Sequence, residues 1–259
     1  MRVDLHNHTP LCNHATGTPK EYIQEAIKQG IDIYGFSDHA PMNFDQKYRM
    51  SFDDMQNYEQ EILDLKDEFK DKVDIRLGYE VDFLDGYIDE RVLNANVDYL
   101  IGSVHFLDDW GFDNPEFIGK YETQNIDDIW QKYFDAIEAM AKFGKFNIVG
   151  HLDLIKVFKY MPKKDIRLIA KDAIKAIKKS GMSVEINSAG WRKPVKEGYP
   201  SKELLEICYE NSIPITFSSD AHKIEDIGFA YDKAVALAKE VGYSECVSYI
   251  NKDMQLHKF

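Results

Sequence analysis

Two patterns of hydrophobic and polar positions alternate along the chain. Short apolar runs rich in Val, Ile, Tyr and Phe are typical of buried β-strands, whereas longer stretches with apolar residues every three or four positions are typical of helices with one buried face. The pattern predicts strands over residues 2–8, 33–37, 74–83, 99–106, 146–151, 183–187 and 214–219. It predicts helices over residues 19–29, 53–72, 126–143, 163–179, 201–211 and 229–241.

The order of these elements predicts the fold class. Strands that alternate with helices form a parallel sheet, and seven such units favour a closed or nearly closed (β/α) barrel over an open sheet. No linker divides the chain, so we expect one α/β domain over residues 1–259. Two long connections, residues 40–52 and 107–125, have the length of loops that cover or line a site. Residues 246–259 follow neither pattern.

Composition narrows the class of partner. The 259 residues are 44% hydrophobic and 30% charged, as in a folded globular domain. The net charge of −13 favours a small-molecule substrate over nucleic acid, because contacts of Lys and Arg with phosphate supply most nucleic-acid affinity. No signal peptide is recognisable and no apolar segment approaches the ~20 residues that span a bilayer, so we expect a cytoplasmic protein with no membrane partner.

The three cysteines, Cys12, Cys208 and Cys246, are too few and too scattered for a disulfide framework. Cys12 lies between His8 and His14 in the sequence, which makes it a candidate metal ligand. A small buried thiol without a chemical role is the favoured interpretation.

The positions of the histidines indicate where the chemistry lies. Seven of the eight lie at the end of a predicted strand or in the loop that follows it, and only His257 does not. In a (β/α) barrel the carboxyl ends of the strands meet on one face, where residues from several strands surround one site. The candidate ligands at these positions are His6, His8, His14, His39, Glu80, His105, His151, Asp220 and His222.

The type and spacing of these residues predict a metal site. Residues two apart in a strand face the same side, so His6 and His8 can bind one ion, and Asp220 and His222 can face the same site. Imidazole and carboxylate ligands suit Zn²⁺, Fe²⁺ and Mn²⁺. Two further carboxylates are expected to orient the ligating imidazoles rather than bind metal: Asp4 and Asp38.

The motifs that contain these residues resemble those of the PHP family, whose name stands for polymerase and histidinol phosphatase. They are Asp4-Leu5-His6-Asn7-His8, Ser37-Asp38-His39, Gly78-Tyr79-Glu80, Gly102-Ser103-Val104-His105, Gly150-His151 and Ser219-Asp220-Ala221-His222. The resemblance covers nearly the whole chain. It implies a distorted, TIM-like (β/α)₇ barrel that holds two to three divalent metal ions at the carboxyl ends of its strands.

The resemblance also implies how the ligands divide among three ions. One ion would be bound by His6, His8, Glu80 and Asp220. A second would be bound by Glu80, His105 and His151, with Glu80 bridging the two. The third would be bound by His14, His39 and His222.

Residues 101–106 and 187–194 are similar to the histidinol-phosphatase branch of the family. In that branch an arginine after the sixth strand contacts the substrate phosphate, and Arg192 matches it. A second arginine is usual after the histidine of the fifth strand, where this chain has Lys156, which offers a point charge without bidentate geometry. Arg192 and Lys156 are therefore the predicted phosphate-binding residues. The candidates for contacting the imidazole of the substrate are Trp110, Phe112 and Phe117.

The predicted reaction is the hydrolysis of a phosphate monoester, with L-histidinol phosphate, an intermediate of histidine biosynthesis, as the expected substrate. Metal ions lower the pKa of bound water and neutralise phosphoryl oxygens, so we expect a metal-bridging hydroxide to attack phosphorus in line. Asp220 and His222 are candidate donors of the proton that the leaving alkoxide needs. The chain has neither the serine-hydrolase nor the P-loop motif.

Three alternatives stay open from the sequence. A PHP-type nuclease or nucleotide phosphatase would use the same ligands, although the acidic charge argues against nucleic acid. A non-catalytic metal-binding module of the same fold would be expected to have lost ligands, and none is missing. A metal amidohydrolase also has His-x-His on its first strand, but it commonly adds a bridging lysine after strand four, which this chain lacks.

Overall fold

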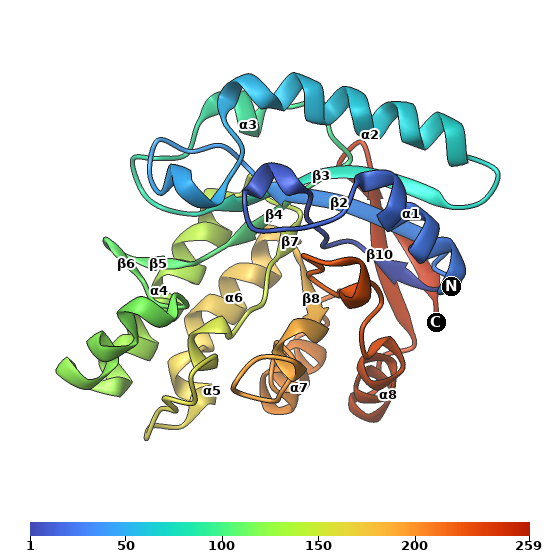
Figure 1. Cartoon of the computed structure of the whole chain (residues 1–259). Helices are drawn as coiled ribbons and strands as arrows, with labels where there is room; N and C mark the ends of the chain where they lie inside the picture. Colours follow the sequence, from blue (N-terminus) through green and yellow to red (C-terminus); the bar gives the residue numbers. More distant parts are fainter.

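Seven parallel strands curl into a nearly closed barrel in the computed structural model, which describes residues 1–259 (Figure 1). In the order of their neighbours, the strands are β1 (Val3–Asp4), β2 (Ile33–His39), β3 (Asp74–Asp82), β4 (Tyr99–Ser103), β7 (Ile148–Val149), β8 (Ser183–Asn187) and β9 (Ile215–Ser218). The N–H of Leu5 donates to the carbonyl of Phe217 (3.1 Å) and so joins the first and last strands. The fold is the predicted distorted TIM-like (β/α)₇ barrel.

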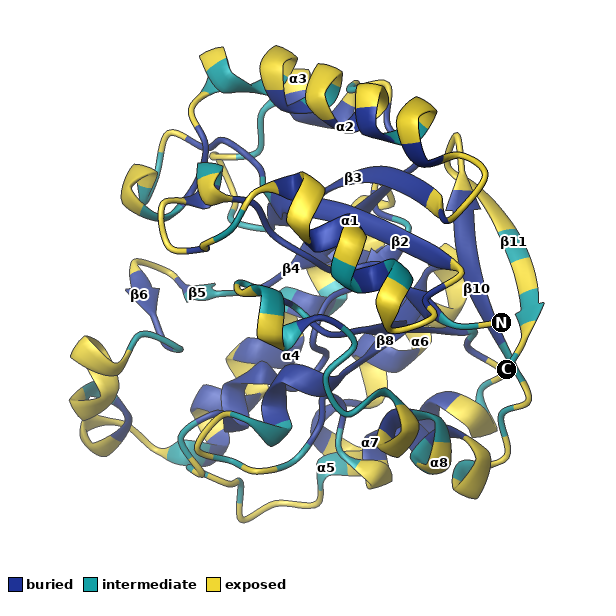
Figure 2. Cartoon of the chain, turned by 45° about the vertical axis from the view of Figure 1, so that its right-hand side comes forward, coloured by how far each residue is buried: buried dark blue, intermediate teal, exposed yellow.

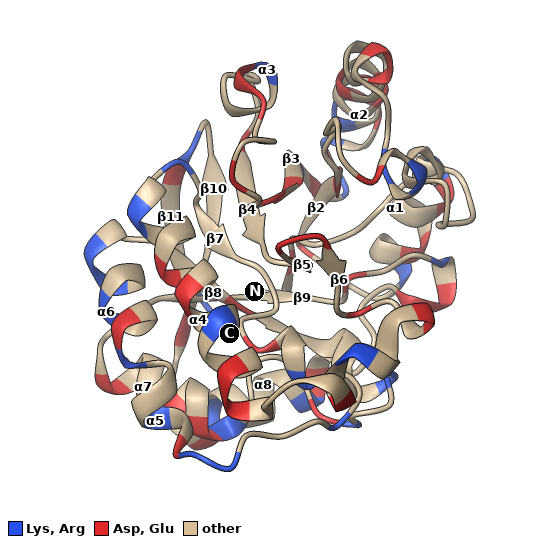
Figure 3. Cartoon of the chain, turned by 90° about the vertical axis from the view of Figure 1, so that its left-hand side faces the viewer, with Lys and Arg blue, Asp and Glu red and all other residues tan.

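Helices cover the outside of this barrel. They are α1 (Pro19–Lys28), α2 (Met55–Phe69), α3 (Glu90–Leu93), α4 (Ile126–Phe143), α5 (Ile166–Ile169), α6 (Lys171–Ser180), α7 (Lys202–Glu210) and α8 (Tyr231–Val241). Figure 2 shows buried residues along the strands and on the inward sides of the helices, whose outward sides are exposed. In the view of Figure 3, Lys and Arg are interspersed with Asp and Glu on the helices. None of the helices has the length and apolar character needed to cross a membrane.

Local sequence sets the ends of the first helix. Thr18 accepts a hydrogen bond from the N–H of Glu21, whose carboxylate accepts one from the N–H of Thr18, so both form a capping box. Pro19 occupies the first turn, where its missing N–H costs no helical hydrogen bond. Gly30 follows the helix with a φ of +68°, a conformation that glycine adopts without a steric penalty. The predicted start of this helix is confirmed, and the helix ends at Lys28, one residue before the predicted end.

Two predicted elements are interrupted in the structure. The fourth strand was expected to reach residue 106, but β4 ends at Ser103 and the chain enters a short hairpin of β5 (Phe106–Leu107) and β6 (Trp110–Gly111). The helix predicted over residues 163–179 begins only at Ile166, because the Asp165 side chain accepts a hydrogen bond from the N–H of Arg167 and caps it there. It then divides into α5 and α6 at Ala170.

The last segment, which sequence patterns left unassigned, closes one end of the barrel. It forms an antiparallel hairpin of β10 (Glu245–Ile250) and β11 (Asp253–Lys258). Cys246, Val247 and Tyr249 of β10 belong to a buried cluster with the barrel strands. The Tyr249 hydroxyl contacts the carbonyl of Asn147 and the hydroxyl of Ser183, each at 2.9 Å, and these residues lie where β7 and β8 begin. The hairpin therefore covers the amino ends of the strands and leaves the carboxyl ends open.

Candidate metal centre and active site

The nine predicted ligands meet at the carboxyl ends of the strands. The ring centroid of His8, after β1, lies 4.4 Å from that of His39 at the end of β2 and 3.9 Å from that of His222 after β9. The rings of His105, after β4, and His151, after β7, are 4.8 Å apart. The parallel topology thus gathers residues from both ends of the chain into one cluster.

Glu80 on β3 lies at the centre of this cluster. Its Oε2 is 2.9 Å from Nδ1 of His39 and 3.3 Å from Nε2 of His6. Its Oε1 is 3.0 Å from Nε2 of His151 and 3.6 Å from Nε2 of His105. The two oxygens of one carboxylate therefore face different histidines, which is the arrangement that a carboxylate bridging two ions requires.

The geometry divides the ligand atoms into compact groups. Within each group the candidate ligand atoms lie within 4.8 Å of one another. Three of the groups are His6, His8 and Glu80; Glu80, His105 and His151; and His14, His39 and His222. These are the groups that the family resemblance implied, apart from Asp220.

Asp220 lies between the first and third groups. Its Oδ1 is 3.3 Å from Nε2 of His8 and 3.5 Å from Nδ1 of His222. The φ angles of Asp220 and His151 are +51° and +20°, in a region that residues other than glycine rarely adopt. Such backbone strain concentrates at functional sites, where the surrounding structure holds a side chain in a required direction.

Most of the imidazoles are fixed by an oxygen atom on the side away from the cluster centre. Nδ1 lies next to an oxygen atom in His6 (Glu185, 2.9 Å), His8 (Asp38, 3.3 Å), His14 (carbonyl of Cys12, 2.7 Å), His105 (Asp82, 2.6 Å) and His222 (carbonyl of Asp220, 3.1 Å). An N–H on Nδ1 leaves the lone pair of Nε2 for a metal ion. Nε2 is buried and has no hydrogen-bond partner in His6, His8 and His222.

Three carboxylates outside the candidate ligand set were predicted with different success: Asp4, Asp38 and Glu185. Asp38 contacts His8, as expected for a residue that orients an imidazole. Asp4 contacts no histidine; it accepts hydrogen bonds from the hydroxyl of Ser219 (2.6 Å) and the N–H of Gly228 (3.3 Å) and so fixes the end of β9. The strand-end rule did not identify Glu185, which lies within β8 and contacts His6.

Asp82 is a second carboxylate that sequence reasoning missed. It lies two residues after Glu80 on β3, contacts Nδ1 of His105 at 2.6 Å and pairs with Arg49 at 2.9 Å. Burial alone would lower the pKa of His105, but the charges of Asp82 and Glu80 outweigh it and raise this pKa to about 10. The i, i+2 spacing from Glu80 was the available sequence signal, because both side chains face the same side of the strand.

Buried carboxylates around the cluster outnumber buried cationic side chains. Glu80, Asp82 and Glu185 are each at most 3% exposed, and Arg49 is the one lysine or arginine that pairs with any of them. Burial alone would raise the pKa of Glu80, but the imidazoles around it outweigh this effect and hold the pKa well below its usual range. Buried charges in proteins are paired or coordinate metals. The donor set therefore fits divalent cations.

The separation of the donor atoms also fits a metal ion. Two ligands at ~2.0–2.1 Å from a tetrahedral ion are about 3.4 Å apart. Nε2 of His6 and Oε2 of Glu80 are separated by 3.3 Å, and Nε2 of His8 and Oδ1 of Asp220 by the same distance. Ions could therefore bind between these atoms with little rearrangement of the chain.

Arg192 lies beside the cluster, after β8. Its guanidinium donates to the carbonyls of Ser219 (2.8 Å) and Asp220 (2.6 Å), and its Nε lies 3.5 Å from Asp226. The side chain is 19% exposed. Arg192 thus supports the backbone next to one candidate ligand, while two of its five N–H groups have no partner in these contacts.

Phosphate contact by Lys156 stays a prediction, and in this structure its ammonium has other partners. This lysine is fully buried, and its ammonium contacts Asp153 (2.9 Å), Glu197 (2.7 Å) and the carbonyl of Gly198 (2.8 Å). An ammonium has three donors, and these contacts occupy them all. Lys156 joins the segment after β7 to the segment after β8, so its role in this structure is to hold these segments together.

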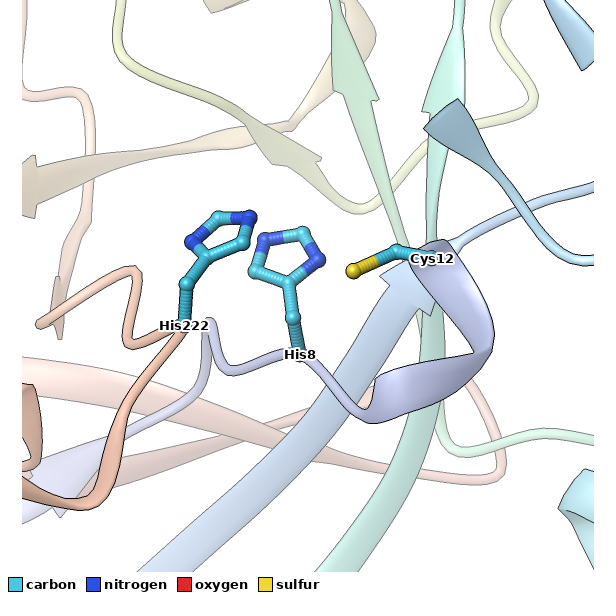
Figure 4. A group of neighbouring side chains, drawn as sticks. All are labelled: His8, Cys12 and His222. Atoms are coloured by element: carbon cyan, nitrogen blue, oxygen red, sulfur yellow. The ribbon is translucent and has the colours of Figure 1, made fainter. Parts of the chain in front are cut away.

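Cys12 lies close to the cluster but differs from the imidazoles in its chemistry. Figure 4 shows the ring of His8 between the ring of His222 and the sulfur of Cys12, and the ligand atoms of these three residues lie within 4.8 Å of one another. Burial and the nearby carboxylate of Asp38 raise the pKa of the Cys12 thiol. A thiol that stays protonated is a poor ligand, which favours the interpretation of Cys12 as a small buried residue.

The aromatic candidates of the long loop after β4 are divided between core and surface. Trp110 and Phe112 are buried and pack against Tyr121 and Tyr133, respectively. Phe117 is 50% exposed. Packing within the core therefore accounts for Trp110 and Phe112, whereas half of the Phe117 side chain is open to solvent.

Comparison with known proteins identifies the family. The family model described as PHP domain matches residues 4–189, and the model described as PHP-associated matches residues 203–244. The chain belongs to the PHP family, as its motifs predicted.

The relatives of the chain within this family are phosphatases by name. The chain is 39% identical to a probable histidinol-phosphatase of Deinococcus radiodurans, over 97% of this chain and 98% of the relative. It is 31% identical to the histidinol-phosphatase of Bacillus subtilis, over 90% and 97%, respectively. The crystal structure of a histidinol phosphate phosphatase of Lactococcus lactis, complexed with zinc, L-histidinol and phosphate, is 24% identical and has a TM-score of 0.81, with 98% of each chain covered. This similarity confirms the barrel fold.

Proposed function

We propose that the chain is a metal-dependent phosphatase that hydrolyses L-histidinol phosphate to L-histidinol and phosphate. The cluster of seven imidazoles around Glu80, several with buried nitrogen atoms that have no partner, carries the assignment to metal chemistry. The names of the two curated relatives, which match nearly the full chain, support the substrate.

The residues of the site have distinct roles in this proposal. Two to three divalent ions, when bound, would activate water and neutralise the phosphoryl oxygens. His6, His8, Glu80 and Asp220 would hold one ion, the groups around His105 and around His14 would hold the others, and Glu80 would be shared. Arg192 would contact the phosphate with the N–H groups that Ser219 and Asp220 leave free.

The source of the proton for the leaving group is a separate question. Burial opposes ionisation of Asp220, but His6 and His8 outweigh it and hold the pKa of Asp220 well below its usual range. An ionised carboxylate suits a metal ligand better than a general acid. Proton donation by Asp220 or His222 stays a prediction.

The test is turnover of purified protein, with its metal content measured alongside. Phosphate release would be followed with L-histidinol phosphate, a nucleotide monophosphate, a generic phosphate ester and a short oligonucleotide. The proposal expects the highest kcat/KM with L-histidinol phosphate and loss of activity on metal removal. Preferential cleavage of the oligonucleotide or nucleotide would favour a PHP-type nuclease or nucleotide phosphatase. Metal binding without turnover of any ester would favour a non-catalytic module.

Other features of the proposal rest on the sequence. We retain one domain over residues 1–259, a cytoplasmic location and the absence of a nucleic-acid partner as predictions. The relatives match over nearly the full length of the chain, which supports a single functional unit.

A further inference from the structure

Glu185 has contacts that the proposed reaction does not use. It lies on β8 and is fully buried, and no lysine or arginine contacts it. Its Oε1 accepts a hydrogen bond from the N–H of His151 (2.6 Å), and its Oε2 lies 2.9 Å from Nδ1 of His6. One carboxylate therefore contacts a ligand from each of two candidate metal groups.

Asn187, two residues further along β8, extends this contact to a third ligand. Its Nδ2 donates to Oε1 of Glu185 (2.9 Å) and to Oδ2 of Asp220 (3.1 Å). Its Oδ1 accepts from the N–H of Ala189 (2.9 Å), so the orientation of the amide is fixed. The two N–H bonds of one amide thus lie between two carboxylates, one fully buried and one partly buried, that would otherwise repel each other.

The proton of His6 must lie on the nitrogen that faces Glu185. Two N–H donors, the backbone of His151 and Nδ2 of Asn187, point at Oε1 of Glu185, so the surroundings of this carboxylate are those of a hydrogen-bond acceptor. An ionised carboxylate accepts hydrogen bonds and donates none. Nδ1 of His6 therefore carries an N–H towards Glu185, and when the imidazole is neutral the lone pair of Nε2 faces Glu80, 3.3 Å away.

We propose that Glu185 and Asn187 are positioning residues that couple the candidate metal groups. Glu185 selects the metal-binding tautomer of His6 and fixes the backbone of His151, and Asn187 holds Glu185 and Asp220 at a set separation. Ligands of two ions are then positioned by one buried network, so damage to it weakens the binding of both. The inference rests on the proposed metal-dependent function.

The test uses Glu185→Gln and the binding of Co²⁺, whose visible absorption reports its ligands. The amide of a glutamine can donate to Nδ1 of His6, which moves the imidazole proton to Nε2. We expect Glu185→Gln to weaken Co²⁺ binding, measured by chelator competition, ~10–100-fold, as other changes behind a ligating histidine do, and to alter the spectrum. Wild-type affinity and spectrum in this variant would overturn the proposal.

The matched control is Asp98→Asn. Asp98 is also a buried carboxylate that accepts backbone hydrogen bonds, from Leu77 (3.0 Å) and Asn251 (3.2 Å), but it lies at the amino ends of the strands. This variant is expected to bind Co²⁺ as the wild type does. An equal loss in both variants would show a general effect of removing a buried charge and would also overturn the proposal.

Asn187→Asp provides a second variant if Glu185→Gln does not fold. It retains an oxygen for the N–H of Ala189 and replaces the donor that faces Glu185 and Asp220 by an oxygen. We expect weaker Co²⁺ binding; binding as tight as in the wild type, or tighter, contradicts the role of Asn187. Substrate is absent from these measurements, so a protein that binds Co²⁺ as expected but does not hydrolyse histidinol phosphate would overturn only the proposed function.

Discussion

Among single residues, Glu80 has the widest influence on the candidate site. Its carboxylate oxygens lie within 3.7 Å of nitrogens of His6, His8, His39, His105 and His151. The negative charge of this one side chain favours positive charge at the imidazoles around it and raises the pKa of His6 and His105. Glu80 thus contacts imidazoles of all three candidate groups, whereas Asp220 contacts imidazoles of only two, His8 and His222.

Glu80→Gln is therefore expected to lower metal content and kcat together. The amide loses the negative charge and one of the two acceptor oxygens, so the loss of metal affinity should exceed the ~10–100-fold typical of residues behind the ligands. Metal analysis and steady-state kinetics of the variant check this. The control is Glu61→Gln on the exposed side of α2, which should leave both quantities unchanged. Full metal content in Glu80→Gln would contradict a shared ligand.

Arg192→Ala tests phosphate recognition apart from metal binding. A charge-assisted hydrogen bond contributes ~1.5–3 kcal/mol, so kcat/KM should fall roughly 10- to 150-fold. Because the guanidinium also holds the carbonyls of Ser219 and Asp220, metal content must be measured in the same samples. We expect it to stay at the wild-type value. If metal is lost in proportion to activity, Arg192 acts by supporting Asp220 and not by binding phosphate.

Sequence reasoning found residues at strand ends and missed those whose partners depend on tertiary structure. His6, His39 and the other candidate ligands were identifiable because parallel strands bring their carboxyl ends together. Glu185 lies in the middle of β8, and nothing in the neighbouring sequence shows that His6 lies next to it. The contacts of Lys156 could not be predicted, because its partner Glu197 is 41 residues away in sequence and joins it only in the folded chain.

At the level of elements, strong local signals gave accurate boundaries. Helix α4 and strand β8 have the predicted bounds because a polar cap or a glycine marks their ends: Asn125 and Gly144 flank the helix, and Gly181 precedes the strand. The hairpin of β10 and β11 escaped prediction because its turn residues, Asn251 and Lys252, both adopt positive φ without glycine. Two-residue turns of this kind usually contain a glycine, which makes them recognisable in the sequence.

The hairpin is expected to contribute to stability and not to catalysis. Tyr249→Phe removes a buried hydroxyl and leaves the carbonyl of Asn147 and the hydroxyl of Ser183 without this partner. Unpaired buried groups cost about 1–3 kcal/mol, so the free energy of unfolding should fall by this amount. Denaturant unfolding measures it. The kcat on histidinol phosphate should not change, because the hairpin lies at the opposite end of the strands; a large fall in kcat at full metal occupancy would contradict this separation.

For the molecule as a whole, metal binding should be linked to proton release. Burial opposes protonation of His105 and His6, but neighbouring carboxylates outweigh it and raise both pKa values, that of His105 to about 10. In the metal-free chain these imidazoles therefore hold protons at pH 7, and an ion must displace them to bind. Metal affinity should rise with pH, and the contribution of His105 to the protons released should fall towards zero as the pH passes about 10.

Calorimetry in two buffers of different ionisation enthalpy checks this linkage. At pH 7 the observed binding enthalpy should differ between the buffers in proportion to the protons released. Activity should decline in acid for the same reason, because protons compete with metal for the imidazoles. Equal enthalpies in both buffers would show that the ligands are already deprotonated.

The burial of the ligands decreases from one side of the cluster to the other, and we expect this difference to affect how fast each bound ion is released. His6 and His8 are fully buried, whereas His14 is exposed and the side chain of His222 is 24% exposed. Water and chelator can reach an ion only where its ligands are open to solvent, so the ion near His14 should exchange first. Metal release to excess chelator should then be biphasic, with the fast phase missing in His14→Ala. A single phase would mean that the ions leave together. If release is biphasic, the number of ions per protein in a preparation depends on how long the protein was dialysed as well as on the affinity of its sites.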